Sequence, residues 1–281
     1  MKSFDDLEEV KAVNAGENLL VVDALNLAFR YKHKKTRNFA PDYVRTVHSL
    51  AASYRCDKII ICADKGQSTY RLGVSPEYKG NRKKMREDQT EQDKEDFQLF
   101  FEDYQRTLEL LGTLFPIVQY QGVEADDAIA YITLNTTEND VWIISTDKDL
   151  DQLVTERVNR FSYVTRKEVR LNNFYETYGC KVEEYITLKV LQGDKGDNVP
   201  GIPLVGPKRA ISLLREFGSA LDLYDALPVT GKQQFVKNIN AFGGQILTNY
   251  ELMDLVAYHE EAIGTENVEN LKEIMEENNI R

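Results

Sequence analysis

The residues most able to do chemistry in this sequence are acidic, and they are densest in Gly122-Val123-Glu124-Ala125-Asp126-Asp127. Three carboxylates in four positions repel one another, so positive charge must offset them. If the segment is helical, Glu124 and Asp127 share one face. An apolar helical pattern follows the motif, and the positive end of a helix dipole favours acids in the first turn. The motif alone therefore indicates either an ordinary acidic helix start or a cation site.

Further acids stand directly after short apolar runs of the kind expected of buried parallel strands. The expected strands are 18–22, 58–63, 115–120 and 141–145. The acids that follow them are Asp23, Asp64, the 122–127 motif, and Asp147 with Asp149. Helical stretches such as 43–54 separate the runs, which predicts a βα-repeating parallel sheet. Such a sheet places its ligand site beyond the carboxyl ends of its strands, so these acids should meet at one rim.

Nine carboxylates converge if the loop 193–198 joins that rim. They are Asp23, Asp64, Glu124, Asp126, Asp127, Asp147, Asp149, Asp194 and Asp197. A helix dipole cannot offset so much charge, which leaves protonation or hard divalent cations with oxygen ligands. None of the three histidines stands beside these acids, so the pattern disfavours zinc. Mg²⁺ or Mn²⁺ is favoured, and two such ions about 3.5–4 Å apart would drive in-line attack on a phosphodiester.

The composition of the 281 residues, 42% hydrophobic and 29% charged, is typical of a soluble globular protein. Its three cysteines form no CxxC pair, which fits a reducing cytoplasm. No apolar run approaches the roughly 20 residues of a membrane span. Residues 1–17 are polar and acidic, so we expect an N-terminal tail and no secretory signal. The net charge of −11 includes any metal-binding acids, so basic patches must be sought locally.

Basic side chains cluster in three places that could attract a nucleic-acid backbone. They are the run 30–37 with Arg30 and Lys32, the stretch 76–86, and the turn 200–209 with Lys208 and Arg209 before a helix at 210–217. The stretch 76–86 contains Tyr78, Lys79, Arg82, Lys83, Lys84 and Arg86. A long helix is expected over 87–111, and its aromatic residues at 97, 100, 101 and 104 have the helical spacing of a core face. Residues 160–171 alternate like a hairpin or edge strand pair, and from 182 onward the sequence is helical.

Taken together, these motifs resemble the 5′-nuclease, or flap endonuclease, family, most closely its stand-alone phage members. The 5′-nuclease domain of bacterial DNA polymerase I is also similar. The matching segments, in family order, are 22–27, 63–66, 76–82, 122–127, 145–149 and 193–198. The resemblance implies an α/β fold with a mostly parallel, PIN-like sheet. It places the nuclease core at 18–181 with a helical arch at about 82–111, and a helical DNA-binding region at 182–281 with a helix-hairpin-helix-like element at about 198–217.

The resemblance also implies roles for single residues. Asp23, Asp64, Glu124, Asp126 and Asp127 match the acids of a first metal site, and Asp147, Asp149, Asp194 and Asp197 match those of a second. Lys79 matches the lysine at the scissile phosphate, with Arg82 assisting and Tyr78 offering its ring to a base. The expected DNA contacts are, from their basic side chains, Arg30, Lys32, Lys83, Lys84 and Arg86, and, from positions that match the family, Lys189, Lys208 and Arg209. The family binds K⁺ at the hairpin, but Leu204 stands where the family usually has the first glycine of a Gly-hydrophobic-Gly pair.

From these observations we expect a Mg²⁺-dependent, monomeric, cytoplasmic 5′-nuclease without a membrane partner. Its substrate would be DNA with a 5′ flap, nick or 5′ end, and RNA-primed DNA is compatible with the family. A PIN-type or RNase H-like ribonuclease is the first alternative, although PIN domains are shorter and lack the arch and hairpin. A non-catalytic DNA-junction binder is the second, but a binder has no need for acids that repel its ligand.

Overall fold

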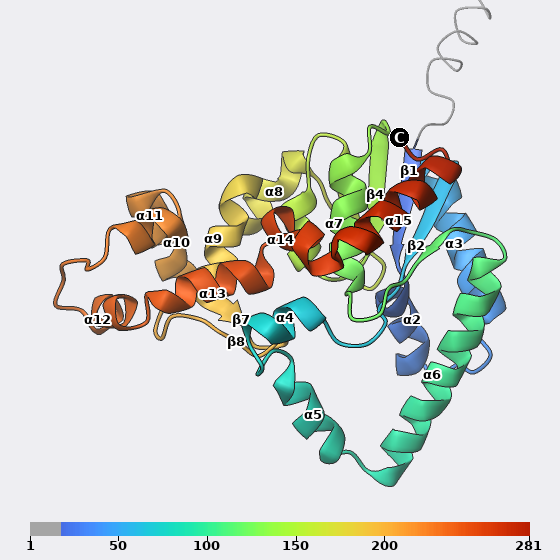
Figure 1. Cartoon of the computed structure of the whole chain (residues 1–281), viewed down its shortest axis with the longest axis horizontal. Coiled ribbons are helices and arrows are strands. Elements are labelled where there is room, and N and C mark those ends of the chain that lie inside the picture. Colours follow the sequence, from blue (N-terminus) through green and yellow to red (C-terminus); the bar gives the residue numbers. More distant parts are fainter. Residues whose placement is uncertain (1–17) are drawn as a thin grey trace, which may run out of the picture.

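A computed structural model describes residues 18–281; the expected tail at 1–17 lies outside the described residues. The described chain contains a six-stranded sheet in the order β3-β2-β1-β4-β5-β6. Figure 1 labels its central strands β1, β2 and β4. Its strands are β1 (Asn18–Asp23), β2 (Lys58–Cys62), β3 (Ile117–Val118), β4 (Asp140–Ile144), β5 (Val158–Ser162) and β6 (Lys167–Val169). Only β6 runs antiparallel to its neighbour, β5. The predicted mostly parallel sheet and the predicted 160–171 hairpin are therefore confirmed.

The register of the central strands brings their carboxyl ends to one edge. Val22 pairs with Ile61 of β2 and with Ile144 of β4. Every residue of β1 after Asn18 is buried, as a strand covered on both faces requires. The third strand is shorter than the expected 115–120, because only Ile117 and Val118 pair with β2.

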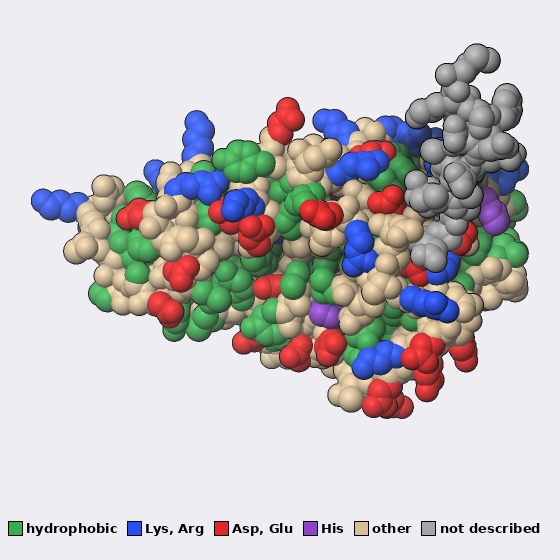
Figure 2. Space-filling model, turned by 90° about the horizontal axis from the view of Figure 1, so that it is seen from above, with side chains coloured by type: hydrophobic (Ala, Val, Ile, Leu, Met, Phe, Trp, Pro, Cys, Tyr) green, Lys and Arg blue, Asp and Glu red, His purple; other side chains and the backbone are tan. Residues whose placement is uncertain are grey.

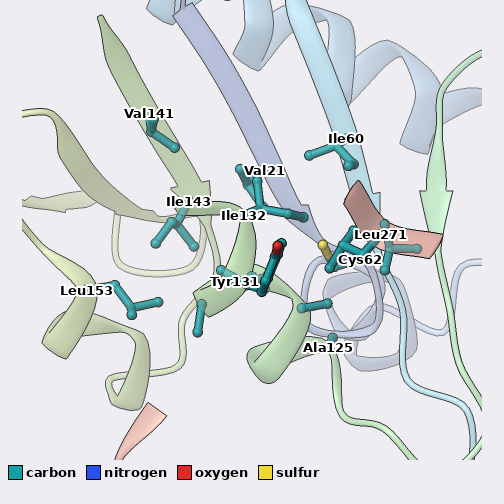
Figure 3. Close-up of a cluster of buried hydrophobic side chains, with 14 of the residues drawn as sticks. Val21, Ile60, Cys62, Ala125, Tyr131, Ile132, Val141, Ile143, Leu153 and Leu271 are labelled. Atoms are coloured by element: carbon teal, nitrogen blue, oxygen red, sulfur yellow. The ribbon is translucent and has the colours of Figure 1, made fainter. Parts of the chain in front are cut away.

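Helices cover both faces of the sheet, and each face has its own core. One core lies under α7 (Ala125–Asn135), α14 (Leu255–Ile263) and α15 (Thr265–Glu277), where Val21 and Ile143 meet Ile132 and Leu271 (Figure 3). The other lies under α2 (Ala24–His33), α3 (Ala40–Tyr54) and α6 (Glu91–Gly112). Leu19 and Val21 belong to the first core and Leu20 and Val22 to the second, as the two-residue period of a strand dictates.

The expected arch is built from α5 (Gly80–Glu87) and α6, which extend away from the sheet and meet at 88–90 (Figure 1). Thr90 and Asp93 form a capping box that starts α6. Phe100 and Tyr104 are buried in the second core and stack on one another. Packing in the core, the predicted role of this aromatic series, is confirmed for these two residues.

Six helices form a helical lobe around a third core: α8 (Leu171–Tyr178), α9 (Val182–Gln192), α10 (Pro207–Phe217), α11 (Ala220–Asp225), α12 (Gln234–Ala241) and α13 (Gly244–Met253). The 3₁₀ helix η1 (Asp149–Leu153) contributes Leu150 and Leu153 to the first core. A small fourth cluster contains Leu72 and Val74 of α4 (Thr69–Val74) and Val199 of β8 (Val199–Pro200), which pairs with β7 (Gly193–Asp194). From α13 the chain turns back, and α14 and α15 complete the first core of the sheet. Within residues 18–281, no helix combines the length and apolarity needed to cross a bilayer.

Candidate active site

The ends of three strands are joined by side chains that also carry the predicted chemistry. Asp23 caps α2 by accepting a hydrogen bond from the Asn26 N–H at 3.2 Å, and its other oxygen accepts one from Ser145 Oγ at 2.7 Å. Asp64 accepts the Ala125 N–H at 2.8 Å, which ties the end of β2 to the start of α7. Asn26 in turn accepts hydrogen bonds from the N–H and the hydroxyl of Thr146. These contacts fix the acids at one edge of the sheet.

We define the first carboxylate group as Asp23, Asp64, Glu124 and Asp126, and the pKa is raised in every member except Glu124. Burial opposes ionisation of Glu124, but Lys79 and Arg71 outweigh it and lower its pKa. Burial and the neighbouring carboxylates of Asp64 and Asp147 raise the pKa of Asp23 to about 7. The pKa of Asp126 is also raised, by burial and by Asp147, Asp23 and Asp64. Burial, with a contribution from Glu124, raises the pKa of Asp64. Acids from separate strand ends thus lie close enough to oppose one another's ionisation.

The second carboxylate group, Asp147, Asp149, Asp194 and Asp197, is held partly by a lysine. Lys189 Nζ lies 2.6 Å from Asp149 and 2.9 Å from Asp194. Burial still raises the pKa of Asp149 to about 6, despite Lys189, and Asp147 adds to the rise. Burial opposes ionisation of Asp194, but Lys189 and the backbone N–H groups of Gly196 and Asp197 outweigh it and lower its pKa. In this structure Lys189 therefore pairs with acids, whereas the resemblance implied a DNA contact.

The two carboxylate groups are connected by Tyr78 and Lys79, which precede α5, and by Arg82 on α5. Lys79 Nζ lies 2.7 Å from Glu124 and 3.5 Å from Asp197. The Tyr78 hydroxyl is 3.0 Å from an oxygen of each of the same two acids. Arg82 pairs with Asp197 at 2.6 Å. The predicted stacking of the Tyr78 ring on a base is wrong for this conformation, because the side chain is packed inside and only 4% exposed.

Asp127 has a different partner from the one predicted. Both of its oxygens accept hydrogen bonds from Arg71, each at 2.7 Å, and the residue is fully buried. The metal role predicted for Asp127 conflicts with this geometry, since Arg71 occupies both of its carboxylate oxygens. Sequence reasoning missed Arg71, which lies 56 positions away in α4 and carries no local motif.

The donor set suits a hard cation. One cavity is lined by Glu124 and Asp126 of the first group and by Asp149, Asp194 and Asp197 of the second. Carboxylate oxygens are the ligands of Mg²⁺ and Mn²⁺. Divalent charge would offset both the burial and the neighbouring carboxylates that raise the pKa values of Asp23, Asp126 and Asp149. Within the described part of the chain, no three Asp, Glu, His or Cys side chains are already gathered tightly enough to hold an ion. Lysines pair with several of the carboxylates instead.

The remaining basic residues differ in their surroundings. The Arg30 guanidinium lies over the Tyr163 ring, 4.1 Å from its centroid, and Lys32 Nζ is 4.4 Å from that of Phe97. Lys208 is exposed, and Arg209 lies over the Phe235 ring. The backbone of Lys83, Lys84 and Arg86 belongs to α5, but their side chains lie outside the described set. Acidic and basic side chains are interspersed on the face seen in Figure 2.

Leu204 has a backbone conformation that glycine usually adopts. Its φ is +70°, in the left-handed region, and its side chain is 56% exposed. The predicted departure from the Gly-hydrophobic-Gly pair thus changes the side chain, while the turn retains the conformation that usually needs glycine.

Comparison with known proteins gives matches along the chain. Residues 18–179 match the family model of the 5′-3′ exonuclease N-terminal resolvase-like domain, and residues 180–276 that of the 5′-3′ exonuclease C-terminal SAM fold. The flap endonuclease of Escherichia phage T5 is 43% identical over 91% of this chain and 89% of its own length. A 5′-3′ exonuclease of Buchnera aphidicola is 32% identical over 74% of this chain and 69% of its own. DNA polymerase I of Bacillus subtilis is 31% identical over 70% of this chain and 22% of that protein.

Solved structures of related proteins also superpose closely on this chain. The phage T5 flap endonuclease in a pseudo-enzyme-product complex with DNA and metal ions superposes with a TM-score of 0.89, at 42% identity, over 93% of this chain and 99% of that one. The T5 5′-exonuclease with bound zinc superposes with a TM-score of 0.88, at 43% identity, over 92% of this chain and 98% of that one.

Proposed function

This chain belongs to the 5′-3′ exonuclease family, and we propose that it is a divalent-metal-dependent, structure-specific 5′-nuclease that hydrolyses DNA. One observation carries the proposal: at one rim, burial and the carboxylates of Asp64 and Asp147 raise the pKa values of Asp23 and Asp126, and the four acids come from separate strand ends. That arrangement is unfavourable for the protein alone and favourable around divalent ions.

We assign the first carboxylate group to one ion and the second group to another. Asp127 is left out because Arg71 takes both its oxygens. When bound, the two ions would supply an activated water and stabilise the leaving oxygen of the phosphodiester. Mg²⁺ is the proposed ion because the ligands are all carboxylates, although a related protein has been solved with zinc.

Lys79 would bind the scissile phosphate. Its ammonium is mostly buried and already lies between Glu124 and Asp197, one from each carboxylate group. Burial opposes its charge, but Glu124 and Asp197 outweigh this and raise its pKa, so it stays protonated. A fixed point charge there suits the charge that develops on a phosphate in the transition state. Arg82, half exposed and paired with Asp197, stands beside it as a second cation.

DNA contacts outside the centre would be to phosphates. Lys208 and Arg209 start α10, and helix starts suit anions. The basic side chains of α5 would attract the single strand, and Arg30 and Lys32 the duplex. Nothing in these residues reads base sequence, so specificity would follow junction shape. Binding of K⁺ at the hairpin, action as a monomer, RNA-primed substrates and a cytoplasmic location stay predictions of the resemblance.

A comparison of three substrates tests the proposal. A 5′-labelled flap, a nicked duplex and an RNA–DNA hybrid of the same sequence are incubated with Mg²⁺ or with excess chelator. We expect flap cutting near the junction, with 5′-phosphate on the downstream product, and none with chelator. Cutting of the hybrid alone would favour the ribonuclease. Tight flap binding without cutting in Mg²⁺ or Mn²⁺ would favour the junction binder.

A further inference from the structure

A segment of the helical lobe enters the site between the two carboxylate groups. The cavity lined by both groups is also lined by Leu252, Met253 and Leu255, where α13 ends and α14 begins. Helix ends leave carbonyl and N–H groups without helical partners, and inside a protein these groups need hydrogen bonds from elsewhere. The side chains that supply them identify what the junction is attached to.

On one side the partner is Arg71. Its Nε donates to the Leu252 carbonyl at 2.9 Å, while its two terminal nitrogens bind Asp127. One of those nitrogens is also 3.4 Å from Glu124. Arg71 is only 4% exposed, so water competes little for these bonds. One guanidinium thus joins the junction to the acidic start of α7, which belongs to the first group.

On the other side the partner is Gln152. Its Nε2 donates to the Asp149 carbonyl at 2.8 Å and to the Met253 carbonyl at 3.1 Å. Its Oε1 accepts the Leu255 N–H at 3.0 Å. Gln152 lies on η1, the 3₁₀ helix that begins at Asp149, and is 7% exposed. A single amide therefore joins the same junction to the backbone of the second group.

We propose that Arg71 and Gln152 are positioning residues that set the separation of the two carboxylate groups by binding both to the 252–255 junction. The path runs from Glu124 and Asp127 through Arg71 to Leu252, and from Met253 and Leu255 through Gln152 to Asp149. Neither residue is assigned to metal or DNA. Two-ion hydrolysis depends on ion spacing, so loss of either link should impair both ion binding and the rate. This inference rests on the proposed function, but its ion-binding part can be measured without cleavage.

Gln152→Met tests the link, because methionine has similar length but cannot form the three hydrogen bonds. Asn159→Leu is the matched control: Asn159 is also a buried amide that donates to a main-chain carbonyl, but it lies on β5 opposite Trp142, within the sheet and away from the carboxyl rim. Four quantities are measured for each variant. Mn²⁺ binding is measured by calorimetry without DNA, and the rate of flap cleavage is measured under single-turnover conditions with Mg²⁺. Flap affinity is measured in chelator, and the folded fraction is measured by urea unfolding.

We expect Gln152→Met to weaken Mn²⁺ binding and slow cleavage, each by about 10- to 100-fold, the usual range for residues that orient metal ligands. Flap affinity in chelator should stay unchanged, and Asn159→Leu should keep Mn²⁺ affinity and rate per folded molecule. Arg71→Lys, which keeps a charge near Asp127 but loses the bond to Leu252, should show the same pattern. Gln152→Met with wild-type Mn²⁺ affinity and rate per folded molecule would overturn the inference, as would equal losses in Asn159→Leu. Failure of the proposed function would appear differently, as an inactive wild-type protein.

Discussion

Arg71 and Asp127 form a bidentate ion pair inside the protein, with both N–O distances at 2.7 Å and no exposed surface on the acid. Asp126, the preceding residue, has a raised pKa because burial and Asp147, Asp23 and Asp64 all disfavour its charge. The two adjacent aspartates therefore have different roles. Asp127 neutralises the buried Arg71 cation, whereas Asp126 adds negative charge to a cluster of acids that needs a cation.

This contrast predicts that substitutions of Asp127 and Asp126 differ in their effect on stability in chelator. Asp127→Asn should lower the free energy of unfolding by about 3–5 kcal/mol, because it leaves a buried guanidinium without its counter-charge. Asp126→Asn should leave stability unchanged or raised, since it removes a repelled charge, while impairing Mg²⁺-dependent cleavage. Urea unfolding of both variants beside the wild type is the measurement. Equal destabilisation by the two would contradict the separate roles.

The sequence patterns predicted the rim well because strand ends are local features. Asp23 and Asp64 follow apolar runs, and the parallel sheet then places them together. Asp127 could not be assigned in the same way, because its partner Arg71 is distant in the chain. Helical spacing placed Asp127 on the same face as Glu124, but it does not predict which residue of another segment packs against Asp127. The burial of Tyr78 and the position of Leu252 beside the acids likewise depend on tertiary packing between segments far apart.

Lys79→Met should reduce the single-turnover rate of flap cleavage by about 100- to 1,000-fold, the usual loss when a preorganised group that stabilises transition-state charge is removed. Flap affinity in chelator should change little, because one mostly buried ammonium contributes little to long-range attraction. Lys65→Met is the control, an exposed lysine directly after Asp64. If Lys65→Met slows cleavage as much as Lys79→Met, general charge near the site explains the loss and the specific role fails.

The pKa values of Asp23, about 7, and Asp149, about 6, predict a pH dependence with a definite sign. Both lie above the ordinary value of 3.8, so between about pH 4 and 7 the folded metal-free protein binds more protons than the unfolded chain. For these two groups, stability in chelator should fall as the pH rises through that window. Apparent Mg²⁺ affinity should rise over pH 6–7, because ions must displace those protons. Calorimetry in buffers of different ionisation enthalpy would count the protons released, and no release at pH 6 would contradict the raised values.

Lys208→Ala should weaken flap binding about equally for every sequence tested. It should also reduce the slope of log affinity against log salt by about 1, the effect of one lost phosphate contact. Lys232→Ala, at another exposed lysine of the helical lobe, should leave the slope unchanged. Titrations of labelled flap at several salt concentrations, in chelator to prevent cutting, measure both. An unchanged slope for Lys208→Ala would remove α10 from the DNA-binding surface.

The most direct measurement is single-turnover cleavage of one 5′ flap by the wild type and by Asp147→Asn, each with Mg²⁺ and with excess chelator. Asp147 contributes to the raised pKa values of Asp23, Asp126 and Asp149, so it lies close to members of both carboxylate groups. The wild type should cut only with Mg²⁺, and Asp147→Asn should be slower by more than about 100-fold, beyond the usual loss for an outer-shell residue, while still binding the flap. Cutting by the wild type in chelator, or equal cutting by Asp147→Asn, would contradict metal-dependent hydrolysis at this rim.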